Sequence, residues 1–152
     1  MKIIKKIVNW KTNTFSICFM VEQHSDDLWN IFNIMNVGDF VYGTVRRKIA
    51  KDTLTGLVKN ERKKFNLLLK IKKFDYDGDS DTIRILGINS KESPYVGLGA
   101  FQSMEITAPM KMTLIKRKFD SIHVKKLNEA IKQANSNSII AITMEEGIAH
   151  IF

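Results

Sequence analysis

The chain has 152 residues, of which 44% are hydrophobic, so it is long and apolar enough for one domain with a buried core. Its formal net charge at pH 7 is +8, and Cys18 is its only cysteine, which excludes an intrachain disulfide framework and a cysteine-based zinc site. That cysteine content suits a reducing, cytoplasmic setting, and the sequence has no apolar run near the roughly 20 residues of a membrane span.

Two strands and one helix are predicted at the start of the chain. Residues 2–9 alternate irregularly and residues 14–22 alternate clearly, which is typical of strands. The period then changes to the i, i+3, i+4, i+7 spacing of a helix face. The residues in that spacing are Leu28, Ile31, Phe32 and Met35. Ser25 can cap this helix, and the segment 37–39 ends it at Gly38.

A long, basic hairpin is predicted next, with residues 40–50 and 61–74 as its arms and its tip near Thr55-Gly56. Residues 46–73 hold eleven Lys and Arg against two acidic residues, an excess of +9, so the rest of the chain is close to neutral. A localised excess of this kind is typical of a surface that binds a polyanion. A solvated strand face is the alternative that composition alone leaves open.

The hairpin supplies the candidate RNA-binding residues. These are Arg46, Arg47, Lys48, Lys51, Lys59, Arg62, Lys63, Lys64, Lys70 and Lys72. Because exposed aromatic side chains are few there, contacts to the phosphate backbone are favoured over base recognition. A second basic cluster, at 111 and 116–118, could extend the same surface or be a solvated strand end.

The rest of the chain completes an α+β fold that is mostly antiparallel β, with one helix near each end. The further predicted elements are a turn at 75–81, strands at 82–88, 103–107 and 112–116, a helix from 120 or 121 to 134, a break at 133–138 and an apolar strand at 138–152. The turn, "DYDGDSD", lacks the Gly and Glu positions of an EF-hand calcium loop, so a plain hairpin turn is favoured.

No catalytic constellation stands out. The three histidines are far apart in the sequence, and no Ser-His-Asp, Cys-His or HExxH spacing occurs. We therefore expect no catalytic residues, metal, cofactor or small-molecule substrate. One alternative is a metal-dependent RNA endonuclease that uses the carboxylates of Glu22, Asp26 and Asp27. Another is a protein-interaction module whose basic face meets an acidic partner.

An ordered set of short segments resembles the N-terminal part of the Pelota family of ribosome-rescue factors, over nearly the whole chain. The segments are "DDLWNIFNIMNVGD" (26–39), "TVRRKI" (44–49), "TG" (55–56), "RKKFNLLLKIKKFDYD" (62–77), "LGIN" (86–89), "YVGLGAFQSMEI" (95–106), "KFDSIHVKKLNEA" (118–130) and "EGIAHI" (146–151).

This resemblance implies a fold and a function. It implies an Sm-like β-barrel, with 1–134 as an RNA-binding domain and 135–152 as a linker and the first strand of a truncated central domain. It also implies a non-enzymatic factor that enters the empty A site of a stalled ribosome, beside rRNA and mRNA, and promotes rescue and no-go mRNA decay. The implied partners are the ribosome and a translational GTPase of the elongation-factor class, with no membrane.

Overall fold

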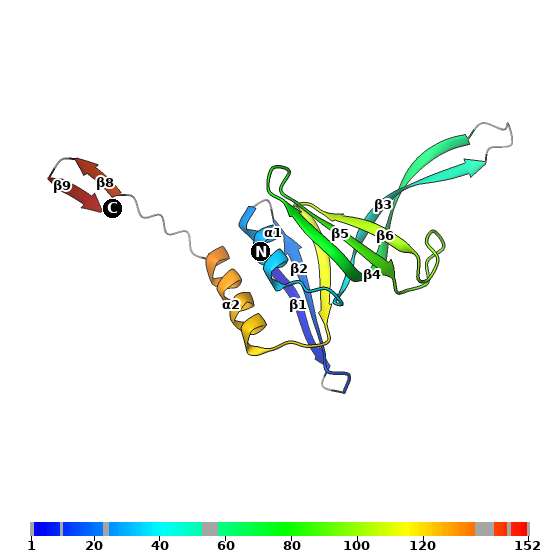
Figure 1. The fold of residues 1–152 in the computed structure, drawn as a ribbon, viewed down its shortest axis with the longest axis horizontal. Helices are drawn as coiled ribbons and strands as arrows, with labels where there is room; N and C mark the ends of the chain where they lie inside the picture. The colour runs from blue at the N-terminus through cyan, green and yellow to red at the C-terminus, as the bar shows by residue number, and fades with distance from the viewer. Residues whose placement is uncertain are drawn as a thin grey trace.

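The computed structural model contains a seven-stranded sheet, a two-stranded sheet and two helices in the residues that it describes (Figure 1). These residues are 2–9, 11–22, 25–52, 58–135, 142–145 and 147–151, and side chains are described in them except at 25, 48–52, 58–61, 133–135, 142–145 and 149–151. The strands are β1 (Lys2–Asn9), β2 (Thr14–Val21), β3 (Phe40–Asp52), β4 (Val58–Asp77), β5 (Thr82–Asn89), β6 (Phe101–Ile106), β7 (Met110–Lys116), β8 (Ile142–Glu145) and β9 (Ile148–Ile151). The helices are α1 (Ser25–Ile34) and α2 (Ser121–Asn135).

The large sheet has the strand order β1-β2-β7-β3-β4-β5-β6, and all its neighbouring strands are antiparallel. In β2, Phe15, Ile17, Phe19 and Val21 are buried, while the residues between them are partly exposed. This alternation places one face of the strand against the core. The predicted fold class, mostly antiparallel β with two helices, is therefore confirmed.

The sheet does not close into the expected Sm-like barrel. β1 and β6 form its two edges, and no ladder joins them among the described residues. β3 pairs with β7 only from Phe40 to Tyr42, after which its described pairing is with β4 alone. Beyond Tyr42, β3 and β4 continue together as the hairpin.

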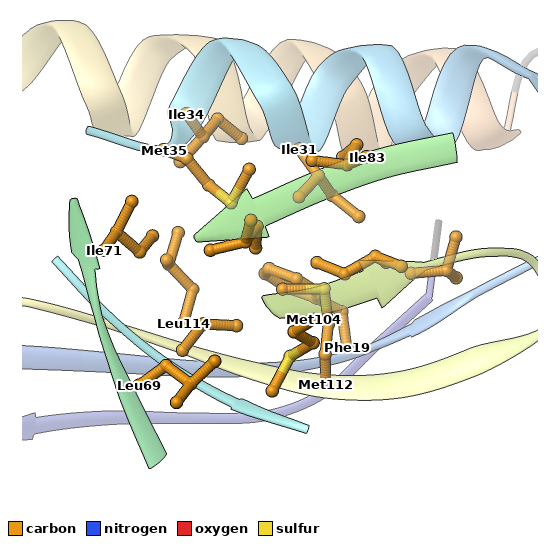
Figure 2. Close-up of a cluster of buried hydrophobic side chains, with 14 of the residues drawn as sticks. Phe19, Ile31, Ile34, Met35, Leu69, Ile71, Ile83, Met104, Met112 and Leu114 are labelled. Atoms are coloured by element: carbon orange, nitrogen blue, oxygen red, sulfur yellow. The ribbon is translucent and has the colours of Figure 1, made fainter. Parts of the chain in front are cut away.

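The core lies between α1 and the sheet. Figure 2 shows Ile31 and Ile34 of α1, and Met35 just after it, beside β5, with Ile83 next to Ile31 and Met104 deeper in the same cluster. These five side chains are at most 2% exposed. Burying a side chain of this size contributes about 1.5–3 kcal/mol each. The apolar helix stripe predicted from the sequence is thus the face that packs on the sheet.

The C-terminal end of α1 is tied to the sheet by a buried cation. Lys116 of β7 is 1% exposed, and its Nζ donates to the carbonyl oxygen of Ile34 at 2.8 Å and to the carboxylate of Asp39. The Asp39 carboxylate also accepts from the backbone N–H of Asn36 at 2.8 Å. Lys116 is therefore not part of a basic surface. The second basic cluster predicted at residues 111 and 116–118 was wrong to include it.

The second helix packs beside the first. Leu127 and Ala130 of α2 are buried, and Lys126 Nζ donates to the carbonyl oxygen of Asn33 at 3.2 Å. His123 Nε2 lies 3.1 Å from Asn36 Nδ2, which adds a polar contact between the same two segments. The predicted helix at 120–134 is confirmed, and its apolar side faces α1.

The C-terminal segment differs from the prediction of one apolar strand at 138–152. β8 and β9 pair with each other, from Ile142↔Ile151 to Glu145↔Ile148. Gly147 between them has φ +85°, a left-handed conformation that glycine adopts without strain. The apolar run therefore folds back on itself as a hairpin.

Candidate nucleic-acid interface

The basic hairpin is longer than the sequence indicated. Its ladder passes the predicted limits at residues 50 and 61 and includes the pairs Lys51↔Lys59 and Asp52↔Val58. The predicted tip at Thr55-Gly56 lies outside the described residues. In Figure 1, β3 and β4 extend past the rest of the sheet as a two-stranded arm. We call residues 46–52 and 58–64 of this arm the cationic ribbon.

Cations occupy both faces of the cationic ribbon, whereas the sequence indicated one basic face. Arg46 pairs with Lys64, and the next pair along the chain, Arg47 with Lys63, points to the opposite side. Closer to the sheet that second side is apolar, with Val45 3% exposed. Beyond Val45 the arm has left the core, so cations can stand on either side without being buried.

The described cations of the ribbon lie at its surface or are half-buried, and they lack carboxylate partners. Arg46, Arg47, Arg62 and Lys64 are exposed and Lys63 is half-buried. In the described part of the chain, none of the five is ion-paired with a carboxylate. The backbones of Lys48, Lys51 and Lys59 are paired in the ladder, and their side chains lie outside the described set. Like charges held this closely repel one another, and a polyanion would relieve that repulsion.

The two remaining candidates lie farther along β4, where the arm has rejoined the sheet. Lys70 Nζ is 6.0 Å from the centre of the Phe40 ring, and the guanidinium carbon of Arg117 is 5.2 Å from the same ring. Lys72 is exposed beside an irregularity in the β4–β5 ladder. Lys70 and Arg117 therefore form a second basic area around the Phe40 ring, at the start of β3 and not on the ribbon.

The root of the ribbon is braced by the loop at residues 90–100, which the sequence reasoning had not connected with the hairpin. Arg47 Nη1 donates to the carbonyl oxygen of Tyr95 at 3.2 Å. Lys63 Nζ lies 5.3 Å from the centre of the Tyr95 ring, which also packs on Phe65 with ring centres 4.8 Å apart. A cation over an aromatic face is attractive. The loop therefore holds one face of the ribbon in a fixed direction.

That loop is itself held by a buried amide. Asn89 is 1% exposed, and its Nδ2 donates to the carbonyl oxygens of Val96 at 2.9 Å and Gly97 at 3.2 Å. Its backbone N–H and carbonyl pair with Ala100 and Gly99. An asparagine at the end of a strand, before a glycine-rich segment, was the available sequence signal for this brace.

Of the three carboxylates proposed for nuclease chemistry, that of Asp27 is used in a structural way. Asp27 is 4% exposed, and its carboxylate accepts from the backbone N–H of Glu22 at 3.2 Å. Within the described ranges, no group of three or more His, Cys, Asp or Glu side chains could hold a metal ion. The predicted hairpin turn is present, but it is limited to residues 78–81 because 75–77 still belong to β4; Asp77 Oδ1 accepts from the N–H groups of Asp79 and Ser80. Asp81 accepts from the Tyr76 hydroxyl, and this hydrogen bond raises the pKa of Tyr76 above its ordinary value.

Of the helices that the structure describes, neither is long and apolar enough to cross a membrane.

Comparison with known proteins gives one family. Residues 1–131 match the family model described as the Pelota N-terminal domain. The protein pelota homologue of Xenopus laevis is 32% identical over 151 residues, which make up 99% of this chain and 39% of that protein. The human protein pelota homologue is 30% identical with the same coverage. The chain thus spans about two-fifths of the length of these curated relatives.

Solved structures show the same fold. Dom34 of S. cerevisiae superposes with a TM-score of 0.67 at 21% identity, covering 99% of this chain and 38% of that one. Pelota of Archaeoglobus fulgidus gives a TM-score of 0.61 at 23% identity, covering 99% and 40%. A model of ribosome-bound archaeal Pelota with ABCE1 gives 0.63 at 22% identity, covering 97% and 42%.

Proposed function

The chain belongs to the Pelota family, and we propose that it binds ribosomal and messenger RNA through the cationic ribbon. The observation that carries this proposal is the set of five ribbon cations without carboxylate partners among the described residues. Phosphate contacts by Lys and Arg supply most of the sequence-independent affinity for nucleic acid, through the release of counterions. The ribbon fits such contacts because its charges lie on a narrow arm with a braced root.

The setting is inferred from the relatives. Dom34 is described as a translation termination-like factor that takes part in RNA quality control and interacts with Hbs1, and archaeal Pelota has been placed on the ribosome together with ABCE1. We propose that this chain acts in the same kind of process, at the empty A site of a stalled ribosome in the cytoplasm. A translational GTPase of the elongation-factor class is the partner proposed for the whole protein.

The domain division remains part of the proposal. We infer that residues 1–134 form the RNA-binding domain, and that 135–152 lead into a central domain. The match to the family model over residues 1–131 supports this boundary, as does the separate pairing of β8 with β9. Non-enzymatic action is proposed with it, because the ribbon offers charge and shape for binding.

The test compares ribosomes whose A site is empty with ribosomes whose A site holds a tRNA. We expect the chain to bind the first and not the second. A fourfold charge reversal, Arg46→Glu, Arg47→Glu, Lys63→Glu and Lys64→Glu, should abolish binding while circular dichroism shows an intact fold. The matched control reverses four exposed lysines outside the ribbon, at Lys2, Lys5, Lys125 and Lys132, and should retain most of the affinity.

Salt dependence gives a second measurement. If five cations each contact one phosphate of unpaired RNA, the logarithm of the binding constant should fall against the logarithm of salt concentration with a slope of about −3.5. A single reversal such as Arg46→Glu, which leaves binding measurable, should make the slope shallower by about 0.7. Equal affinity of the wild-type and ribbon-reversed proteins for empty-A-site ribosomes would refute the proposed function.

A further inference from the structure

A groove lies at the root of the cationic ribbon, between the start of the ribbon and the strands β6 and β7. Its volume is about 660 Å³, which lies within the range of ordinary ligand sites. One wall is formed by β3 and β4 at the point where the ribbon begins, and the other by β6 and the start of β7. The residues that line it are Thr44, Val45, Arg46, Lys64, Gln102, Ser103, Glu105, Thr107, Pro109, Met110 and Lys111.

The groove exists because the sheet is open at this place. β3 loses its β7 partner after Tyr42, and in the described residues no ladder joins β3 to β6. Gly43 lets the two walls approach below the groove, since a Cβ there would lie 3.1 Å from Met110 Cε and 3.2 Å from Met104 Sδ. Backbone groups along two such facing edges lack a ladder partner and can bond a ligand.

The charge of the groove selects its ligand. Three cations line it, Arg46 and Lys64 from the ribbon and Lys111 from β7, and all three are exposed. Glu105 is the acidic member of the lining, and its carboxylate lies 3.9 Å from the guanidinium Nε of Arg84 on the next strand. The net positive lining favours an anion, and the volume of about 660 Å³ has room for a ligand larger than a single phosphate ion.

We propose that this groove binds the sugar–phosphate backbone of a single-stranded RNA segment that runs along the root of the cationic ribbon. Hydroxyl and amide side chains at Thr107, Ser103 and Gln102 supply donors and acceptors for phosphates and ribose hydroxyls. No aromatic side chain is among the lining residues, so bases are not stacked and recognition is independent of sequence. The inference deepens the proposed function and rests on it.

An acidic protein segment could enter the same open edge as an added strand, and the test separates the two. A charge reversal at Lys111 is informative because this residue lies on β7, outside the hairpin. Lys125→Glu, on the exposed side of α2, changes the net charge by the same amount. The probes are a fluorescein-labelled oligouridylate of twelve nucleotides and an oligoglutamate of twelve residues, and binding to the whole chain is measured by fluorescence anisotropy.

We expect Lys111→Glu to weaken oligouridylate binding about tenfold, as for the loss of a charged hydrogen bond. Its salt slope should become shallower by about 0.7, the value for one phosphate contact to a single strand. Lys111→Arg should restore both. Lys125→Glu should change affinity less than twofold, and thermal melts of all three variants should match that of the wild type.

Crosslinking locates the contact directly. Oligouridylate carrying 4-thiouridine should crosslink to the tryptic peptide 92–111 of the wild-type chain, with the modified residue between 102 and 111. The inference is overturned if Lys111→Glu behaves like Lys125→Glu, if crosslinks stay on the hairpin, or if oligoglutamate binds more tightly than the RNA and loses affinity in Lys111→Glu. The proposed function is tested separately, because it depends on the fourfold ribbon reversal. If that variant still loses ribosome binding, the proposed function holds even when the groove inference fails.

Discussion

Replacing Lys116 by methionine should cost the protein a large part of its stability. The substitution keeps the length of the side chain and removes the charge that bonds the Asp39 carboxylate and the Ile34 carbonyl oxygen. Removing one partner of a buried ion pair costs about 3–5 kcal/mol, because the other charge stays buried without compensation. Asp39 keeps the backbone N–H of Asn36 as a donor, so we place the loss near the lower limit, at about 3 kcal/mol. Since whole domains are stable by only about 5–15 kcal/mol, this is a large fraction.

The assay is urea unfolding followed by tryptophan fluorescence, to which Trp29 on α1 contributes through its packing on Phe32. The double variant Lys116→Met with Asp39→Asn removes both charges. We expect it to lose about 1–3 kcal/mol less than the sum of the single losses, as for residues in direct contact. Lys118→Met, two positions along and exposed, is the control and should change stability by less than about 0.5 kcal/mol. A loss below about 1 kcal/mol for Lys116→Met, or strict additivity in the double variant, would refute the reasoning.

Two further predictions concern the sheet and α2. Gly87→Ala places a Cβ 2.8 Å from the backbone oxygen of Lys70, so it should lower the free energy of unfolding by about 1–3 kcal/mol in urea melts. Gly97→Ala is the control, because a Cβ there meets nothing within 4 Å, and it should leave the free energy of unfolding unchanged. The pKa of Asp120 is lowered below 3.8, mainly by the hydrogen bond from the backbone N–H of His123 and to a smaller extent by the His123 side chain. His123 Nδ1 and Asp120 Oδ1 are 2.7 Å apart but are not aligned as a hydrogen bond. The ionised carboxylate of Asp120 therefore stabilises the folded chain above pH 3.8, and this contribution is lost as the pH falls through the lowered pKa of the folded state. His123→Ala should raise the pKa of Asp120 part of the way toward 3.8, because the backbone bond stays. Carboxyl NMR titration measures this, and an unchanged pKa would show that the ring has no part in it.

Elements with a strong period were predictable from the sequence. The i, i+3, i+4, i+7 stripe of α1 predicts a helix and the alternation in β2 predicts a strand, because only these structures place all the apolar residues of each pattern on one buried face. The basic hairpin was predictable for the same reason, since its apolar positions at Val41 and Leu67 alternate with polar ones. Whether these residues bind RNA remains a proposal.

Features that depend on long-range contacts were not predictable. The ladder irregularity between Ile71 and Lys73 lets Phe74 and Tyr76 pack against the core, although strict alternation from Ile71 would have turned them outward. Burial of Lys116 depends on Asp39, which is 77 positions earlier in the chain. The contact of Arg47 with Tyr95 likewise joins segments that no local pattern connects.

The placement of Arg46 and Arg47 on opposite sides of one thin arm limits the shape of its target. A flat duplex surface would touch a single row of these charges and leave the other row in water. A narrow slot with phosphates on both walls would engage both rows at once, and a wider slot would engage neither fully. If the ribbon binds RNA as proposed, its two rows of charge make it sensitive to the width of the slot as well as to the charge of the slot, and a tRNA already filling such a slot would exclude it by volume alone.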